Sequence, residues 1–388
     1  MADNKKPIVV LVDTFHLFQA LTGIKSYTQQ LCEGLLDIDD PRFRYVTFPS
    51  WKNASRSDFL RGKTSIPFKL LNHLLFFSWK LVVLPLYIFK HRVDVVIAPD
   101  FVAPKTKDSI LTVPVLHDLF FWEFPENYNP VWLPIFKKMI YRGIHDKSVI
   151  LTTSHYIKNK INTTLALEAP IEVAYQSFAA REHQKAAYVE LSKEEPFFPD
   201  TWQNTPFFLH AGVFDSRKNI PFLIEAFREF RTQITCDCKL VLIGSRGLSV
   251  NHDDWNVCKR LIERYDLSEH VWMPGFVSDN VLKKCYQLAH AYVFPSLEEG
   301  FGIPILEAMN EGLPVLVSSQ GPLKEIGDNA VLAFDPKQVD SLTRAMKASF
   351  DPALREELIA KGKERVRMFT QQQFAQRVHQ VVSDYVSK

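Results

Sequence analysis

The sequence lacks an excess of charge of either sign, and it lacks the cysteine pattern of a disulfide framework or a zinc site. The chain has 46 lysines and arginines against 44 acidic residues, a formal net charge of +2, which excludes a strongly basic nucleic-acid binder at whole-chain level. The five cysteines are odd in number and scattered, and Cys236 and Cys238 have no second pair or nearby histidine. We therefore expect reduced thiols, no bound metal and a cytoplasmic location.

Two common phosphate-binding motifs are also missing. No G-x-G-x-x-G follows a predicted strand, and Gly62-Lys63-Thr64 resembles the end of a P-loop but has Ser57 where the first glycine is required. Asp37-Ile38-Asp39 has a spacing that can hold a divalent cation. It ends a predicted helix beside Pro41, however, and a solvated turn explains it better. A nicotinamide-dependent dehydrogenase therefore has little support.

The sequence has one long apolar run, residues 74–89, and it is interrupted by Lys80 and Pro85. It is predicted to be too short for a membrane span. Two interpretations stay open: a buried helix, which the length favours, or a helix on a membrane surface. Anionic lipid would favour the second, because basic residues surround the run: Lys63, Lys69, Lys80, Lys90, His91 and Arg92. The apolar run at the N-terminus is of strand length and lacks a cleavage site, which predicts a strand rather than a signal peptide.

Short runs rich in valine and isoleucine alternate with helical patterns along most of the chain. Examples are residues 8–12, 93–98 and 110–116, and the alternation restarts at residue 207 after a polar, proline-punctuated stretch at 181–206. Such alternation is typical of parallel βαβ units. We therefore expect an α/β chain of two doubly wound domains with an interdomain linker, and a ligand site in the cleft between them.

Residues 294–308 carry the clearest chemistry. A predicted strand ends at Pro295, a glycine-bearing loop follows, and a helix begins near Pro304, where proline suits the first helical turn. Glu299 lies in the loop and Glu307 lies one turn into the helix. The loop glycines allow close approach of a ligand, and the free amides at the helix start favour anions.

Glu299 and Glu307, separated by seven residues, resemble the E-x7-E motif of glycosyltransferase family 4, and residues 312–318 and 322–328 resemble its continuation. The resemblance covers roughly residues 8–370. It implies the GT-B fold, with an acceptor-side Rossmann-like domain (1–195), a nucleotide-sugar-binding Rossmann-like domain (196–370), and a C-terminal helix (371–388) that packs back on the first domain. It implies that Glu307 holds the ribose hydroxyls and Glu299 the transferred sugar, with donor contacts from Gly300, Phe301 and Gly302.

Arg217 and Lys218 occupy the places where this family has an Arg and a Lys after the first strand of its second domain. The resemblance implies that they neutralise the diphosphate. Breaking a sugar–phosphate bond builds negative charge on the leaving group, and two fixed cations stabilise that charge without Mg²⁺. A solvated basic turn is the structural alternative.

Further positions match the family more loosely. Gly23 resembles the G-I loop whose amide reaches the diphosphate, although Ser26 stands where the family often has Arg. His117 resembles the histidine of the H-D segment that lines the donor-sugar pocket, and Asp118 would orient it; a satisfied structural histidine is the alternative. Gly244, and Phe276 with Val277, resemble strand-end segments that face the nucleotide, with ordinary turns as the alternative.

These features predict a retaining, metal-independent glycosyltransferase without a cofactor, in which a departing phosphate oxygen takes the proton of the acceptor hydroxyl. The resemblance favours bacterial mannosyltransferases of surface polysaccharide assembly, with GDP-mannose as donor, a glycan or lipid-linked acceptor and peripheral membrane association. Three alternatives stay open: a UDP-sugar donor, a GT-B epimerase or phosphorylase, and a non-catalytic scaffold partner.

Overall fold

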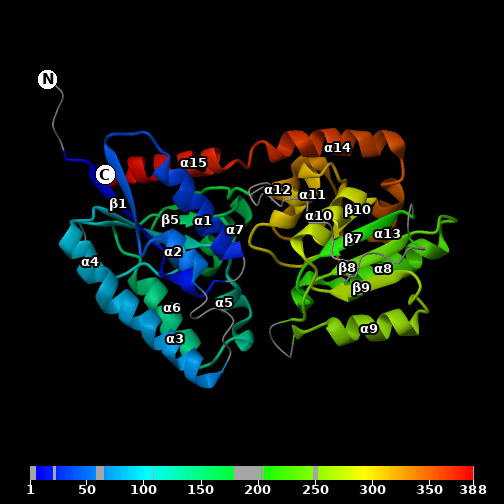
Figure 1. The fold of residues 1–388 in the computed structure, drawn as a ribbon, viewed down its shortest axis with the longest axis horizontal. Helices are drawn as coiled ribbons and strands as arrows, with labels where there is room; N and C mark the ends of the chain where they lie inside the picture. Colours follow the sequence, from blue (N-terminus) through cyan, green and yellow to red (C-terminus); the bar gives the residue numbers. More distant parts are fainter. Residues whose placement is uncertain are drawn as a thin grey trace. The chain divides into compact units, whose positions relative to one another are not determined.

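The computed structural model describes residues 6–20, 23–57, 65–107, 109–178, 202, 205–247 and 252–387. The chain forms two compact units (Figure 1): unit 1 comprises Met1–Ala179 and Phe369–Lys388, and unit 2 comprises Ala180–Met368. The predicted domain boundary at 195/196 and most of the predicted linker at 181–206 lie outside the described residues. Both units are parallel α/β folds, which confirms the predicted fold class.

Unit 1 contains a six-stranded parallel sheet of order β2-β1-β3-β4-β5-β6. Its strands are buried runs of apolar residues, as expected where helices cover both faces of a parallel sheet. The strands are β1 (Ile8–Asp13), β2 (Phe43–Phe48), β3 (Val95–Ala98), β4 (Leu111–Leu116), β5 (Ile150–Thr152) and β6 (Ile171–Val173). The helices are η1 (Phe15–Phe18), α1 (Gly23–Leu36), α2 (Trp51–Arg56), α3 (Ile66–Ser78), η2 (Trp79–Val83), α4 (Leu84–His91), α5 (Phe120–Glu123), η3 (Pro125–Asn127), α6 (Trp132–Arg142), α7 (His155–Thr164) and α15 (Gln371–Val386).

Unit 2 contains a second six-stranded parallel sheet, of order β12-β11-β10-β7-β8-β9. The strands are β7 (Phe207–Ala211), β8 (Lys239–Ile243), β9 (Val271–Gly275), β10 (Ala291–Phe294), β11 (Val315–Ser318) and β12 (Val331–Phe334). The helices are η6 (Ser216–Lys218), α8 (Ile220–Thr232), α9 (Trp255–Arg264), α10 (Asp279–Leu288), α11 (Ile303–Asn310), α12 (Leu323–Gly327), η8 (Asp328–Ala330), α13 (Val339–Ala348) and α14 (Pro352–Val366).

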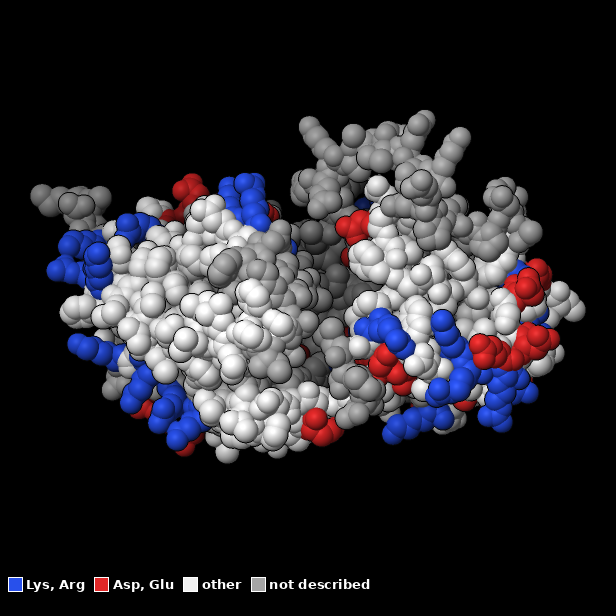
Figure 2. Space-filling view, turned by 60° about the horizontal axis from the view of Figure 1, so that its bottom comes forward, with Lys and Arg blue, Asp and Glu red and all other residues white. Residues whose placement is uncertain are grey.

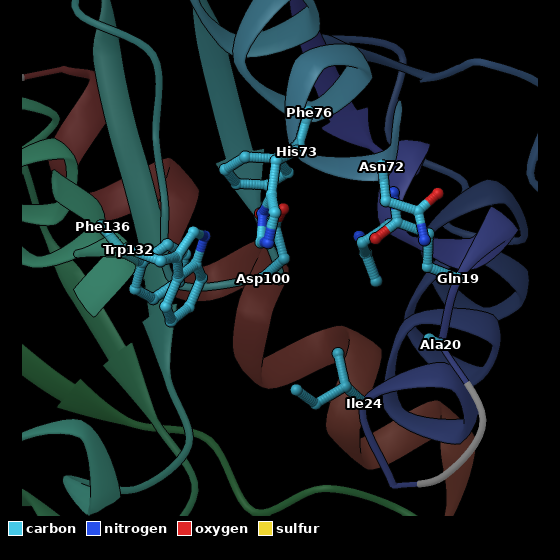
Figure 3. Close-up of a pocket in the computed structure, with 10 residues that line it drawn as sticks. Gln19, Ala20, Ile24, Asn72, His73, Phe76, Asp100, Trp132 and Phe136 are labelled. Carbon is cyan, nitrogen blue, oxygen red and sulfur yellow. The ribbon is translucent and has the colours of Figure 1, made fainter. Parts of the chain in front are cut away.

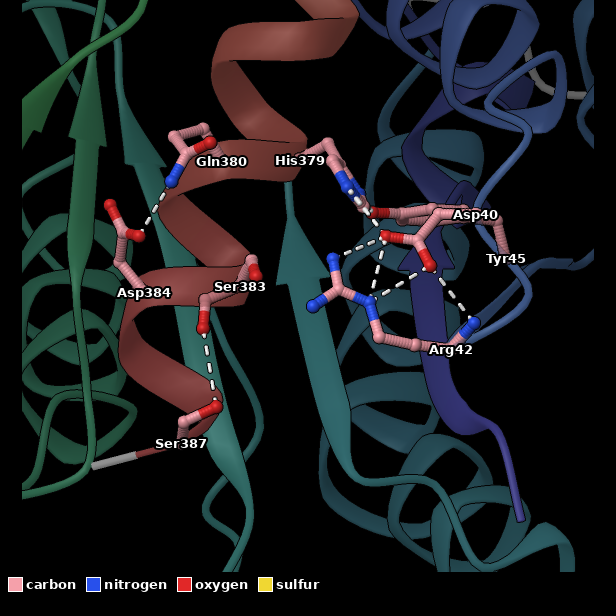
Figure 4. A network of polar contacts seen from close by, with 8 residues as sticks. All are labelled: Asp40, Arg42, Tyr45, His379, Gln380, Ser383, Asp384 and Ser387. Carbon is pink, nitrogen blue, oxygen red and sulfur yellow. Dashed lines mark hydrogen bonds and ion pairs between the residues drawn. The ribbon is translucent and has the colours of Figure 1, made fainter. Parts of the chain in front are cut away.

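Helix α15 is the last element of the chain, yet it packs into the core of unit 1, as predicted. Phe374, Val378 and Val382 are buried among side chains of β1 and α1. Polar contacts fix the helix from its outer side (Figure 4): His379 Nδ1 and the Tyr45 hydroxyl are 2.7 Å apart, and His379 Nε2 lies 3.3 Å from Asp40 Oδ2. Residues far apart in the sequence therefore build one core.

The apolar run of unit 1 forms a longer and more exposed helix than the sequence predicts. Helices α3 and α4 are joined through the π-helical turn η2, and Leu70–His91 is long and apolar enough to cross a membrane, by length and composition alone; 22% of the most apolar part is buried. The interpretation of residues 74–89 as a buried helix is wrong for its outer face, because these side chains are exposed: Leu74, Leu81, Val82, Val83, Leu86 and Phe89. Lys80, one of the basic residues that surround the run, is buried and is therefore not available to anionic lipid.

Candidate functional site

The predicted nucleotide-sugar residues of unit 2 gather at one edge of its sheet. Strands β7 and β10 are neighbours, but β7 leads to β8 on one side and β10 leads to β11 on the other. Such a reversal of strand order leaves a crevice at the carboxyl ends of the two strands, where open α/β sheets bind ligands. Arg217 and Lys218 lie in the loop after β7, and Glu299 lies in the loop after β10. The order of elements along the chain therefore places both loops at this crevice.

The loop after β7 is held by Asp215. Its carboxylate caps the 3₁₀ turn η6, where Oδ1 accepts hydrogen bonds from Arg217 N at 3.1 Å and from Arg217 Nε at 3.0 Å. The Arg217 side chain is 24% exposed. Since one edge of the guanidinium is fixed, its direction is set before any ligand arrives.

Lys218 and Glu299, which the sequence predicts for different parts of the donor, lie in direct contact. Lys218 Nζ is 2.5 Å from Glu299 Oε1, and both side chains are mostly buried. The ammonium also lies 4.9 Å from the centre of the Phe294 ring. The amide of Leu297 donates to the carbonyl of Arg217 at 2.8 Å and thereby ties the two loops together.

The second glutamate of the motif lies on α11. Gly302, directly before the helix, has φ +111, a backbone conformation that favours glycine, and a Cβ there would displace the Leu323 side chain, whose Cδ2 would lie 2.6 Å away. Glu307 Oε2 accepts a hydrogen bond from the hydroxyl of Tyr286 on α10 at 3.1 Å. Tyr286 was not predicted, because nothing in its sequence spacing relates it to α11.

Strand-end glycines bring β7 and β8 close together beside these residues. Gly244 has φ +152, and a Cβ there would lie 1.7 Å from the Gly212 carbonyl oxygen. After β9, Val277 is buried, whereas Phe276 is 82% exposed. The glycine at 244 is thus demanded by the fold itself, and the donor contacts predicted for Gly244, Phe276 and Val277 stay predictions.

His210 is a polar residue of this unit for which no role was predicted. It lies within the apolar strand β7, where Nδ1 donates to the carbonyl of Val293 at 2.9 Å and burial lowers the pKa to about 4. Its Nε2 has no hydrogen-bond partner among the described residues, and a Cβ on Gly212 would lie 3.3 Å from it. A histidine inside an apolar strand is the signal that could have identified it.

In unit 1, the predicted residues lie at the ends of different elements. Gly23 begins α1, and a Cβ there would meet no atom within 4 Å of the described part. His117 follows β4, where Nε2 donates to the Pro99 carbonyl at 2.8 Å and burial lowers the pKa to about 4. Asp118 accepts a hydrogen bond from the Phe120 amide. These contacts are those of a structural histidine beside a fixed loop, and the donor roles of His117 and Gly23 stay predictions.

A charged cluster lies buried in unit 1 and was not predicted. Lys80 Nζ lies 2.6 Å from Asp13 Oδ2, 2.7 Å from Asp100 Oδ1 and 2.7 Å from the carbonyl of Val102. The Trp79 indole donates to the other oxygen of Asp13 at 3.0 Å. Lys80 lies on η2, whereas Asp13 ends β1 and Asp100 follows β3, so the cluster marks the carboxyl edge of the unit 1 sheet.

Potential metal ligands do not cluster in the part of the chain that the structure describes. No group of three or more histidine, cysteine, aspartate or glutamate side chains in it could hold an ion. All five cysteines are free, and burial raises the pKa of Cys238, Cys258 and Cys285 to about 12. These thiols are therefore protonated and poorly nucleophilic at neutral pH.

The chain is similar to known sugar transferases in sequence and in fold. Residues 192–365 match the family described as glycosyl transferases group 1. The chain is 28% identical over 273 residues to O-antigen chain mannosyltransferase B of Escherichia coli, which covers 70% of this chain and 69% of that protein. It is 33% identical over 177 residues to serotype-specific mannosyltransferase WbdA of the same species, over 45% of this chain and 21% of that protein.

Among solved structures, sucrose-phosphate synthase from Thermosynechococcus elongatus superimposes with a TM-score of 0.69 at 18% identity, over 98% of this chain and 99% of that one. The fold is therefore GT-B, and the chain carries a group 1 glycosyltransferase domain related to the O-antigen mannosyltransferases. The chain spans about a fifth of the length of the second relative, WbdA. The similarity in fold and sequence does not by itself assign the reaction of either relative to this chain.

Proposed function

We propose that this chain, whose residues 192–365 match the group 1 glycosyl transferases, is a retaining, metal-independent enzyme that transfers mannose from GDP-mannose. The proposed acceptor is a glycan or a lipid-linked sugar in surface polysaccharide assembly. The observation that carries this proposal is the convergence of Arg217, Lys218 and Glu299 at the β7/β10 switch point of unit 2. The relatedness to O-antigen mannosyltransferases supports the choice of sugar.

The ion pair between Lys218 and Glu299 gives the donor site a definite resting state. Each group neutralises the other at 2.5 Å. A diphosphate beside Arg217 offers Lys218 a more highly charged partner, and the released carboxylate of Glu299 can then accept hydrogen bonds from sugar hydroxyls. Binding of the nucleotide diphosphate and capture of the sugar are coupled in this way.

The proposed reaction retains the anomeric configuration. The bond between the sugar C1 and the diphosphate oxygen breaks, and the acceptor hydroxyl oxygen forms the new bond on the same face. Its proton passes to the departing phosphate oxygen. Arg217 and Lys218 stabilise the charge that grows on the leaving group, and this stabilisation takes the place of a divalent cation.

The site is tested by two substitutions with a matched control. We expect Lys218→Met and Glu299→Gln to lower kcat about a hundredfold or more, since each removes a charge that acts on the transition state. Glu298→Gln, one residue away, should stay within a few fold of the wild type. The activity of all three variants is measured as the rate of GDP release. Equal activity of all variants would remove the site from the mechanism.

Stereochemistry, metal and donor are tested on the wild type. The anomeric coupling of the product by NMR should show retention, and the rate should be unchanged in excess EDTA. GDP-mannose should raise Tm more than UDP-glucose or UDP-N-acetylglucosamine, because a ligand that binds only the folded state stabilises it. An inverted product, loss of activity with EDTA, or stabilisation by a UDP-sugar alone would each overturn the corresponding part.

We further propose that unit 1 associates with the surface of an anionic membrane through an apolar face. This face comprises the exposed residues Leu70, Leu74, Leu81, Val82, Val83, Leu86 and Phe89 of α3–η2–α4, with Val131, which directly precedes the neighbouring α6, and Ile135 within α6. Figure 2 shows a broad area of uncharged residues here, with lysines and arginines along its edge. Lys90, His91 and Arg92 are exposed at the end of α4, where anionic head groups would meet them.

Membrane association is measured by flotation with vesicles of phosphatidylglycerol and phosphatidylethanolamine, compared with neutral phosphatidylcholine vesicles. The double substitution Leu81→Glu/Leu86→Glu places two charges in the apolar face and should abolish flotation. Leu288→Glu changes an exposed leucine of unit 2 and should leave flotation unchanged. If the double variant floats as well as the wild type, this face is not the membrane contact.

A further inference from the structure

Unit 1 contains a cavity of about 350 Å³ that no part of the proposed donor site uses. It lies at the carboxyl ends of β1 and β3, because His16 and Gln19 follow β1 and Asp100 follows β3. Strand β1 leads to the edge strand β2, whereas β3 leads to β4 on the other side, so the strand order reverses here too. The cavity therefore occupies the place in this sheet where ligands bind.

Four polar atoms that belong to residues lining the cavity are buried without a hydrogen-bond partner in the described structure: His16 Nδ1, Gln19 Nε2, Asn72 Oδ1 and Asp100 Oδ2. Buried polar groups are nearly always satisfied, since an unsatisfied one costs free energy. Figure 3 shows Asp100 and His73 on one side of an open space that Gln19 and Asn72 border on another. A ligand that fills this space would satisfy several of these atoms at once.

The hydrogen-bonding role of His16 follows from its neighbours. The Thr28 hydroxyl donates to the Ile24 carbonyl at 2.9 Å, so its oxygen accepts from His16 Nε2–H at 2.8 Å. His16 Nδ1 is then an acceptor, and burial lowers the pKa of the ring to about 3, which keeps it neutral. Three of the four atoms, on His16, Asn72 and Asp100, are thus acceptors, and they suit a ligand that offers several hydroxyl donors.

The charge of the cavity argues against an anionic ligand. Asp100 Oδ1 is already bound to Lys80, which is shared with Asp13, so one cation faces two carboxyl groups. Lys80 itself lies behind Asp100 and is not among the lining residues. A phosphate would meet mainly acceptors and a carboxyl group, whereas a neutral polyol would meet complementary partners.

Three aromatic side chains, Phe76, Trp132 and Phe136, form a further part of the cavity wall. Trp132 and Phe136 are stacked with ring centroids 4.4 Å apart and an interplanar angle of 21°, and Phe76 lies against Phe136. A pyranose ring has both kinds of surface: hydroxyls around its edge and a face of C–H groups that packs on an aromatic ring. We propose that this cavity binds one neutral pyranose unit of the acceptor glycan, an assignment that rests on the proposed transfer reaction.

The position of the cavity also fits an acceptor that is held by a lipid. Asn72 and Phe76 of the cavity lie on α3, the helix whose outer face exposes Leu70 and Leu74. The cavity and the proposed membrane face thus share one helix, which suits an acceptor sugar whose lipid chain is held in the membrane. A free glycan offers the same pyranose, and the experiment separates the two sources.

The test measures binding to the full chain by saturation-transfer NMR and calorimetry, with no donor present. The ligands are methyl α-mannopyranoside and α-1,3-mannobiose. We expect Trp132→Ala to weaken binding tenfold or more and Asn72→Ala about three- to tenfold, as for the loss of an aromatic wall and of one hydrogen bond. Asn159→Ala, an exposed asparagine of α7, is the matched control and should bind as the wild type does. Methyl mannoside 6-phosphate should bind more weakly than the neutral sugar.

Three outcomes would overturn the assignment: no binding of either neutral sugar, equal binding by all variants, or tighter binding of the phosphorylated sugar. In turnover, Asn72→Ala should raise KM for the acceptor while KM for GDP-mannose and kcat stay unchanged. The two sources are separated by comparing free mannobiose with mannobiose attached to an undecyl chain in anionic vesicles. Tighter binding of the lipid-linked form would identify a lipid-linked acceptor, and tighter binding of the free form would identify a free glycan. If the wild type does not bind GDP-mannose, the proposed reaction is wrong, but the measured binding of neutral sugars to the cavity remains valid.

Discussion

Lys80 shows at the scale of a single residue how much a buried charge depends on its partners. Its ammonium group makes three close contacts, to Asp13, Asp100 and the Val102 carbonyl, and both carboxyl groups are themselves buried. Removing the cation leaves two carboxyl groups in a low-dielectric place without compensation, which is much more costly than the net contribution of the intact cluster.

We therefore expect Lys80→Met to lower the free energy of unfolding by about 3–5 kcal/mol. The loss should shrink as pH falls below about 6, since a protonated carboxyl group needs no cation, and burial raises the pKa of Asp100 to about 6 even beside Lys80. Lys361→Met breaks an exposed pair with Glu357 and should cost less than about 1 kcal/mol. Urea unfolding at pH 7.5 and 5 measures both variants. A similar loss in both would show that the buried cluster contributes nothing special.

The sequence predicted part of the candidate site, for reasons that are visible in particular residues. The loops with Lys218 and Glu299 follow strands that are adjacent in the sheet, so chain order and a motif sufficed to bring them together. Tyr286, His210 and Asp100 were missed. Each acquires its role from a neighbour on another element, and such a contact exists only once the strand order and helix packing are known.

At the scale of elements, the crossing of α1 and α15 depends on one glycine. A Cβ on Gly34 would lie 2.6 Å from Ala375 Cβ and 3.2 Å from the Gln371 carbonyl oxygen, atoms that cannot move aside. Alanine is the better helix former by about 1 kcal/mol, but forcing two packed helices apart costs about 1–3 kcal/mol. The steric term is the larger.

Gly34→Ala should accordingly destabilise unit 1 despite its higher helix propensity. Gly362→Ala in α14 is the matched control, because the nearest atom there is Met309 Cγ at 3.2 Å, part of a flexible side chain. This control should be neutral or slightly stabilising. Thermal unfolding of both variants decides the matter: if Gly34→Ala raises Tm, the close approach of the two helices is not a constraint.

Strongly periodic elements were predicted well, and elements defined by their neighbours were not. Helix α15 and the strands β1 and β4 lie within a few residues of their expected bounds. Strands β6 and β12 are three and four residues long at the edges of their sheets, too short to show a pattern. Pro85 suggested an interrupted helix. It lies instead in the first turn of α4 after the π-helical turn η2, where its missing amide does not break the helix.

At the scale of the whole molecule, buried neutral histidines are distributed over both units. Burial lowers the pKa of His16 to about 3 and those of His117 and His210 to about 4, against about 6.5 in an unfolded chain. Below pH 6.5 these histidines bind protons in the unfolded chain but stay neutral in the folded protein. Asp100 acts in the opposite direction, since its raised pKa favours the folded state as pH falls below about 6.

Three histidines outweigh one aspartate, so the free energy of unfolding should fall steadily between pH 6.5 and 4. Each histidine contributes a slope of about 1.4 kcal/mol per pH unit where only the unfolded chain is protonated. Urea midpoints at pH 7.5, 6.5, 5.5 and 4.5 measure the decline. His210→Gln keeps a donor for the Val293 carbonyl and should flatten the decline by about one histidine's share, whereas His91→Gln, at an exposed position, should leave it unchanged. Stability that is constant or rises over this range would show that these rings accept protons in the folded protein.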